Sequence, residues 1–345
     1  MPVRSFTDTS AVSLAYALAD GLAPADFAGK TFNFLPFTAE GFQMSKESKM
    51  SSAIRMNRRV ANSKNTKGSA SGSVTVEFGG AQFVRDLLSL TLMNDWAEVE
   101  AGVPESGKYL VDGSGIRLMA VEKTAKSGPG STDVQYHERY YGTAVNDSTL
   151  EFGDGELVTL ALNTVSVFAD YAEAAAGADG LGGSLSTTPK TLPSPYEVAD
   201  SSNNLKSLTI KDDQGAAIPL VFTDASLQIQ NNVREQPGLG KEFAAGVGMG
   251  KVNATLSGEV YFLDQTLLDS HMTNKRLSAE MSIETAEGTY TIHMPNLVAQ
   301  APANSAEGEN QDYKTKLTLT AEEGSVMIGA SSTPCAIAVI YVPKP

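Results

Sequence analysis

Period-two alternation of apolar and polar residues is the sequence feature that most constrains how this chain folds. It recurs along almost the whole chain, in runs bounded by Gly, Asn, Asp and Pro, and such runs are typical of antiparallel β-strands. Helical periodicity is scarce: amphipathic stretches occupy residues 81–93 and 264–273, with a weaker one at 11–22. The predicted strands are residues 31–37, 73–78, 116–123, 134–141, 157–168, 225–231, 253–262, 277–284, 289–297, 313–320 and 336–342.

One order of predicted elements occurs twice: strand, long loop, strand, helix and three further strands. The first copy has its loop at residues 46–72 and its helix at 83–90, and the second has them at 234–250 and 265–272. The first copy also carries an insertion at residues 98–114. The apolar residues expected to pack the two helices on their sheets are Phe83, Leu87, Leu88, Trp96, Leu267 and Leu268.

The repeat predicts two domains, which also suits a length of 345 residues. The stretch between the copies is dense in Ala, Gly, Ser and Pro, as linkers are. We therefore predict a first domain with an N-terminal arm at residues 1–175, a linker at 173–202 and a second domain at 203–345.

Charge is distributed unevenly along the chain. The formal net charge is −14, which argues against a protein that reads DNA or RNA, because such proteins need a basic face. Residues 46–67 carry seven basic residues against one acidic residue, a balance of +6, which leaves −20 for the remainder. This asymmetry predicts a basic arm that meets an acidic partner, and another copy of the same chain could be that partner.

Composition also bears on cellular location. No apolar run approaches the roughly 18 to 20 residues of a membrane span, and residues 1–20 lack a charged leader followed by an apolar stretch. We therefore expect a soluble protein made in a cytosol. The single cysteine, Cys335, lies beside a strand-like run and is predicted to be a packed thiol.

Motifs for catalysis and metal binding are incomplete wherever they begin. His137-Glu138 opens like a zinc protease helix, but Tyr141 stands where the second histidine would be. The stretch GVGMGK at residues 246–251 lacks the first glycine and the Ser or Thr of a phosphate-binding loop. The three histidines lie in unrelated segments, so no catalytic triad can be nominated. We expect no enzyme activity, no metal and no cofactor.

Four stretches of the second half carry a resemblance to a known family: SLQIQNNVREQPGLG at residues 226–240, GMG at 248–250, SGEVYF at 257–262 and GTYTIHMP at 288–295. In the first half Glu47, Ser48, Arg55 and the helix that ends near Trp96 follow in the same order. Together these positions resemble the major tail tube proteins of siphophages, over most of residues 42–342. The resemblance implies a mainly β fold with two tandem tail-tube-type domains that form sandwiches or barrels, each with a short flanking helix.

That resemblance implies a structural virion protein of the phage tail, assembled in the host cytoplasm. Its copies would form stacked rings of pseudo-six-fold symmetry, as trimers of a duplicated chain, with a polar lumen through which genomic DNA passes without specific binding. Expected partners are neighbouring copies in the same and adjacent rings and the tape measure, distal tail and terminator proteins. The residues predicted to contact the adjacent ring are Lys46, Lys49, Arg55, Arg58, Arg59, Lys64, Lys67, Arg234 and Lys241.

Three alternatives stay open at the level of sequence. The same fold could serve a related injection-machine tube or a tail terminator. A carbohydrate-binding or adhesive β-sandwich would need an exposed aromatic platform, yet Trp96 is the single tryptophan and stands at a helix end. A hydrolase on a β scaffold is disfavoured because every catalytic motif is incomplete.

Overall fold

The computed structural model describes residues 12–19, 21–27, 30–52, 62–100, 106–126, 134–175, 196–262, 265–305 and 312–344, and it is mainly β, as predicted. The helices are α1 (Pro24–Phe27), α2 (Gln82–Leu92) and α3 (Thr266–Met272). The strands are β1 (Val12–Ala19), β2 (Asn33–Leu35), β3 (Ala39–Glu40), β4 (Gln43–Met50), β5 (Ser63–Glu77), β6 (Ala97–Glu98), β7 (Lys108–Val111), β8 (Leu118–Lys126), β9 (Val134–Gly153), β10 (Thr159–Ala175), β11 (Leu205–Lys211), β12 (Ala217–Ile218), β13 (Phe222–Gln230), β14 (Arg234–Gln236), β15 (Gly246–Gly248), β16 (Asn253–Tyr261), β17 (Arg276–Glu284), β18 (Gly288–Ala299), β19 (Ala303–Ser305), β20 (Lys314–Ala321), β21 (Gly324–Ile328), β22 (Ser331–Cys335) and β23 (Ala338–Pro343).

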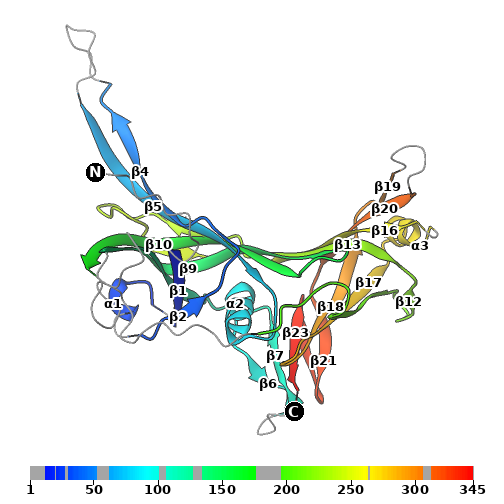
Figure 1. Ribbon diagram of the computed structural model, residues 1–345. Helices are drawn as coiled ribbons and strands as arrows, with labels where there is room; N and C mark the ends of the chain where they lie inside the picture. Colours follow the sequence, from blue (N-terminus) through cyan, green and yellow to red (C-terminus); the bar gives the residue numbers. More distant parts are fainter. Residues whose placement is uncertain are drawn as a thin grey trace.

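One sheet runs through both halves of the chain (Figure 1). Its central strands follow the order β4, β5, β10, β9, β13, β16, β20 and β18, and each is antiparallel to its neighbours. β3 continues the line of β4 beside β5, and β19 continues that of β18 beside β20. The halves join where residues 147–153 of β9 pair with residues 224–230 of β13.

Strand pairings follow the same order in the two halves. In the first half β5 pairs with β10, β10 with β9, β9 with β8, and β8 with β1. In the second half β16 pairs with β20, β20 with β18, β18 with β17, and β17 with β11. A helix follows β5 in the first half and β16 in the second, at the places where amphipathic stretches predicted helices.

The main hydrophobic core lies against one face of this sheet and includes residues of both halves, such as Val74, Leu160, Leu227 and Leu256. α2 lies on that side, below the sheet in Figure 1, and buries Phe83, Leu87 and most of its other residues there. Burial along β13 and β16 alternates strictly at the apolar positions, which is the pattern of a sheet with one covered face.

One predicted helix and two predicted loops differ from the structure. The weak helical stretch at residues 11–22 is the strand β1, which pairs with β8 along its whole length. Leu14 and Tyr16 face the main core while Ala15 and Ala17 face a second cluster, so both faces are buried and the period-two signal is lost. The predicted loop at residues 46–72 is largely the hairpin β4–β5, and the one at 234–250 contains the small hairpin β14–β15. Most of the predicted linker, residues 176–195, lies outside the described residues.

Candidate functional site

The face of the main sheet opposite the core is polar in three rows that cross its middle, whereas Val165 and Ala144, in the row beyond Asn163, belong to a buried apolar cluster. One row of paired residues crosses it from β5 to β16: Ser73, Asn163, Asp147, Gln230 and Asn253. Two further rows cross the face from β5 to β20. The second row is Thr75, Ala161, Thr149, Gln228, Thr255 and Thr320. The third row is Glu77, Thr159, Glu151, Ser226, Ser257 and Thr318. Because side chains of paired residues point to the same face, these rows form one continuous polar surface, which we call the open face.

The open face is acidic, and two lysines neutralise part of its negative charge. Glu77, Asp147, Glu151, Asp224 and Glu259 contribute five carboxylates, against the ammonium groups of Lys314 and Lys316. Both lysines pair with Glu259, at 3.5 and 3.2 Å. The hydrogen bond from Lys316 and the nearby positive charges lower the pKa of Glu259. A polyanion that approaches this face therefore meets no free cluster of basic side chains among the described residues.

The row of eight central strands has two unpaired edges among the described residues. One is the outer edge of β4, since β4 pairs with β5 alone. The other is the edge formed by the end of β18 and by β19, beyond the point where Arg276 of β17 pairs with Val298. These edges lie at opposite ends of the sheet in Figure 1. Unpaired edges offer rows of backbone N–H and C=O groups to another strand.

The base of the β4–β5 hairpin is fixed to the segment 234–250 of the second half. Lys46 pairs with Glu242, and Lys67 pairs with Glu235 at 2.8 Å. The N–H of Gly68 donates to the carbonyl of Glu242 at 2.8 Å. The hydrogen bond to Glu235 raises the pKa of Lys67. Lys49 also pairs with Glu47, at 3.8 Å, so three of the predicted inter-ring residues make contacts within the chain.

Most of the predicted inter-ring residues lie further out or outside the described part. Lys49 and Lys64 are exposed and directly opposite each other across β4 and β5. Arg55, Arg58 and Arg59 lie outside the described residues. Arg234 is exposed at the start of β14, and Lys241 is exposed in the turn before β15. The hairpin projects well beyond the rest of the molecule in Figure 1.

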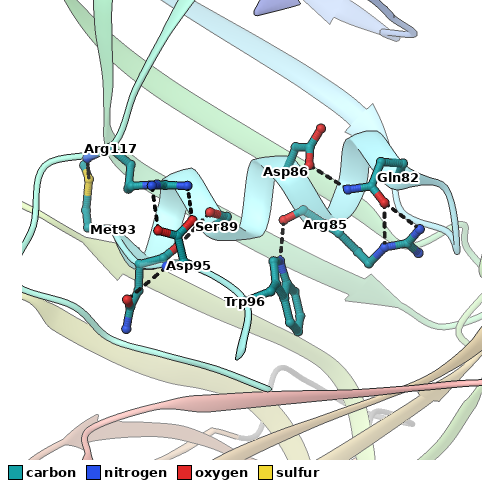
Figure 2. Close-up of polar contacts among 9 residues, drawn as sticks. Gln82, Arg85, Asp86, Ser89, Met93, Asp95, Trp96 and Arg117 are labelled. Atoms are coloured by element: carbon teal, nitrogen blue, oxygen red, sulfur yellow. Dashed lines mark hydrogen bonds and ion pairs between the residues drawn. The ribbon is translucent and has the colours of Figure 1, made fainter. Parts of the chain in front are cut away.

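Polar contacts join α2 to the turn that follows it (Figure 2). The indole N–H of Trp96 donates to the carbonyl of Arg85 at 2.9 Å, so this tryptophan packs on the helix and forms no exposed platform. The helix ends at Met93, whose φ of 52° is left-handed and whose N–H donates to the carbonyl of Ser89. Leu88 and Leu267 are buried, whereas Leu268 of α3 is 37% exposed.

Asn231 is a buried polar residue at the junction of the halves. It is 1% exposed, and its Nδ2 donates to the carbonyls of Thr91 and Val145 at 2.9 and 3.0 Å. Its N–H donates to the carbonyl of Asn146, whose Oδ1 accepts from Val233. This amide joins the end of α2 and strand β9 of the first half to the second half.

We expect Asn231→Leu to lower the free energy of unfolding by about 2–4 kcal/mol, because it removes the donor of two hydrogen bonds to buried carbonyls. Equilibrium urea denaturation of the unassembled protein measures this. Asn163→Leu on β10 is the matched control, since Asn163 is exposed; its effect should stay within about 0.5 kcal/mol. Equal losses in the two variants would contradict the structural role assigned to Asn231.

The remaining sequence candidates lie in separate places. His137 is in β9 beside Thr124, His271 is in α3 and His293 is in β18. The thiol of Cys335 is buried, and burial raises its pKa to about 11. In the described part of the chain, no helix is both long and apolar enough to cross a membrane.

A sheet with a polar face and unpaired edge strands has free backbone groups with which further strands could pair. A family model described as phage tail tube protein matches residues 8–322, nearly the whole chain. The chain therefore belongs to the phage tail tube protein family, a family of structural components of the virion tail. A search of curated proteins finds no match.

Sequence reasoning did not identify the residues of the open face or the two edges. Alternation within each strand separates polar from apolar positions, but it does not say which strands are neighbours. The pairing of β9 with β13 joins segments about 80 residues apart and carries no local signal. The repeated element order was the signal from which that junction could have been inferred.

Proposed function

We propose that three copies of this chain close into a ring, and that stacked rings form the tail tube of a siphophage through which genomic DNA leaves the virion. The junction of β9 with β13 carries this proposal. At this junction the sheet of the first half continues into the second half through seven antiparallel residue pairs. The same strand pairing between two chains needs a free edge like that of β9 on one chain and a free edge like that of β13 on the other. The β18–β19 edge and the β4 edge are these two edges.

The free edges correspond to the two sides of that internal junction. We propose that residues 1–175 and 203–345 are two copies of one domain, because their strand pairings follow the same order. In this correspondence the end of β18 with β19 takes the place of β9, and β3 with β4 takes the place of β13. A neighbour's β4 therefore adds to the β18–β19 edge as β13 adds to β9. The contact joins different surfaces, so it generates a ring when the rotation closes.

The number of strands favours three copies. Each chain supplies eight strands to the sheet, counted over the described residues, so a trimer closes a barrel of 24. With strands about 4.8 Å apart and tilted by about 40°, such a barrel is about 48 Å across, and side chains leave a bore of roughly 38 Å. That bore admits one DNA duplex. A hexamer of this chain would leave a bore more than twice as wide.

The open face supports a conduit that does not bind its cargo. The core covers the other face of the sheet, so in the closed barrel the polar rows line the lumen. Basic side chains would hold DNA by releasing counterions, whereas carboxylates and neutral amides do not. Genomic DNA would therefore pass without a specific site, and the terminal partners would be the tape measure, distal tail and terminator proteins.

The β4–β5 hairpin supports stacking of rings in the tail, with assembly in the host cytoplasm. Lys49 and Lys64 face each other, and like charges directly opposite destabilise a strand pair, although Glu47, 3.8 Å from Lys49, offsets part of the repulsion. An acidic surface on the adjacent ring would relieve this repulsion. The basic residues Arg55, Arg58 and Arg59, which lie beyond β4 in the sequence, would strengthen the same contact.

Electron microscopy of the purified protein over a range of concentration and salt tests the proposal. We expect hollow rings with three chains by native mass spectrometry, and tubes that shorten as salt screens the hairpin contacts. Rings of six chains would contradict the trimer and leave the tube standing. Compact monomers at every concentration, also in the presence of preformed tail tips, would overturn the proposed function.

A further inference from the structure

An aromatic cluster closes the junction between the halves on the core side. Phe78, which directly follows β5, makes an edge-to-face contact with Tyr290 of β18, with ring centroids 5.2 Å apart. Tyr290 is fully buried there. Tyr341 of β23 packs on Tyr290 at 4.7 Å and lies under the guanidinium of Arg85 on α2, also at 4.7 Å. The second half thus covers the end of β5 and the first turn of α2 with aromatic side chains.

Phe262 occupies the position in the second half that Phe78 occupies in the first. Each phenylalanine directly follows its strand and stands four residues before the helix begins. Each also donates its N–H to the residue just before the next strand of the sheet: Phe78 to the carbonyl of Val158 at 2.9 Å, and Phe262 to that of Tyr313 at 3.1 Å. The backbone around the two residues is therefore arranged in the same way.

Tyr136 likewise occupies the position of Tyr290. In the β17–β18 hairpin, Tyr290 pairs with Ile283 as the second pair from the turn. In the β8–β9 hairpin, Tyr136 pairs with Ala125, again as the second pair from the turn. Both positions begin the long strand that runs along the main sheet.

What differs between the halves is exposure. On α2, Val84 and Leu88 are buried in the main core. The corresponding positions of α3, counted from the start of each helix, are Leu268 and Met272, which are 37% and 74% exposed. Tyr313, which packs on Phe262, is also exposed. We call Phe262, Leu268, Met272 and Tyr313 the α3 patch.

Tyr136 forms a matching exposed patch. It is 46% exposed, whereas Tyr290 is fully buried. Tyr171 of β10 is 80% exposed and shares its face, because it pairs with Glu138, two residues along β9. Figure 1 shows this end of β9 and β10 and the helix α3 at opposite ends of the molecule. One chain cannot join the two patches, but neighbours in a ring can.

We infer that Tyr136 and Tyr171 of one copy pack on the α3 patch of the next copy, as Tyr290 packs on Phe78 within the chain. The inference rests on the proposed ring, because the contact forms only when β4 of the neighbour adds to the β18–β19 edge. The contact would bury apolar side chains that are exposed to water in a single chain. Aromatic residues that fill such pockets contribute strongly to binding, so the contact adds stability and sets the angle between neighbours.

Cross-linking with a short bifunctional maleimide tests the pair directly. We expect Tyr136→Cys/Phe262→Cys to give covalent dimers and trimers from assembled rings, and monomers only at concentrations too low for assembly. The native thiol of Cys335 stays silent because it is buried and its pKa is raised. Tyr136→Cys/Leu157→Cys is the matched control, since Leu157 is also exposed but has no predicted partner. Rings that form without cross-links in the first variant would overturn the inference.

Oxidative footprinting of the natural protein covers the case in which the cysteine variants do not assemble. On ring formation the oxidation rate of Met272 should fall about tenfold, because interface cores exclude water as interiors do. Tyr136 should be protected in parallel, while Met327, 64% exposed on β21, keeps its rate. Unchanged oxidation of Met272 and Tyr136 in rings overturns the inference and leaves the proposed tube intact. If the natural protein forms no rings, the proposed function fails instead.

Discussion

Met44→Pro is expected to abolish ring formation while the chain still folds. The N–H of Gly41 donates to the carbonyl of Ser73 on β5. Because N–H groups alternate in direction along an antiparallel strand, that of Met44 points away from β5, to the free edge. The N–H of Phe42, which points the same way, is already taken by the carboxylate of Glu40 at 3.2 Å. Met44 thus offers the next donor to a neighbouring strand.

Proline removes this donor and places its ring where the neighbour's carbonyl would lie. A lost hydrogen bond with steric exclusion costs at least about 1.4 kcal/mol, or tenfold in affinity, at each contact. A closed trimer contains the contact three times, so ring formation should fall by about a thousandfold or more. Analytical ultracentrifugation across a concentration series measures this loss.

Met44→Ala is the matched control for the edge. Met44 is half-buried against the main core, so both substitutions remove the same packing and lower stability alike. Only proline removes the N–H. We expect Met44→Ala to form rings at close to the natural concentration. If Met44→Pro also forms rings normally, β4 is not the edge that joins the subunits.

Local pattern was sufficient for the elements that have one covered face. The strands around residues 253–262 and 289–297 and the helix before Met93 were predicted from alternation or amphipathicity, and each is found within a few residues of the prediction. These segments have a polar side and an apolar side, so their period survives in the sequence. β1 was mispredicted because neither of its faces is polar.

Long-range pairing was not predictable in the same way. Residues 46–72 are rich in Ser, Lys, Arg and Asn and have few apolar positions, so the hairpin β4–β5 has little strand signal of its own. Its base is held instead by Glu235 and Glu242, which are about 170 and 200 residues from their lysine partners. The open face depends on the register between strands, which a shift of one residue would reverse.

Gln228→Lys is expected to make the proposed lumen bind DNA, which the natural lumen should not do. Gln228 lies on the open face between Thr149 of β9 and Thr255 of β16. Each added lysine neutralises about one phosphate and steepens the dependence of binding on salt, and each ring of the proposed trimer would contribute three lysines at one height. A short DNA duplex should sediment with variant tubes at low salt, with binding that falls by orders of magnitude as salt rises to physiological levels. Natural tubes should bind little at either salt.

A control must show that DNA binding depends on where the lysine is placed and not only on the added positive charge. Gln214→Lys makes the same change in an exposed turn between β11 and β12, away from the open face. It should leave the duplex unbound, and electron microscopy should show tubes of natural width for both variants. Equal binding by the two variants would place Gln228 outside the lumen. If only the Gln228 variant holds DNA, and a phage carrying it ejects its genome more slowly, then the polar face is the wall along which DNA moves and its acidity is what keeps the DNA mobile.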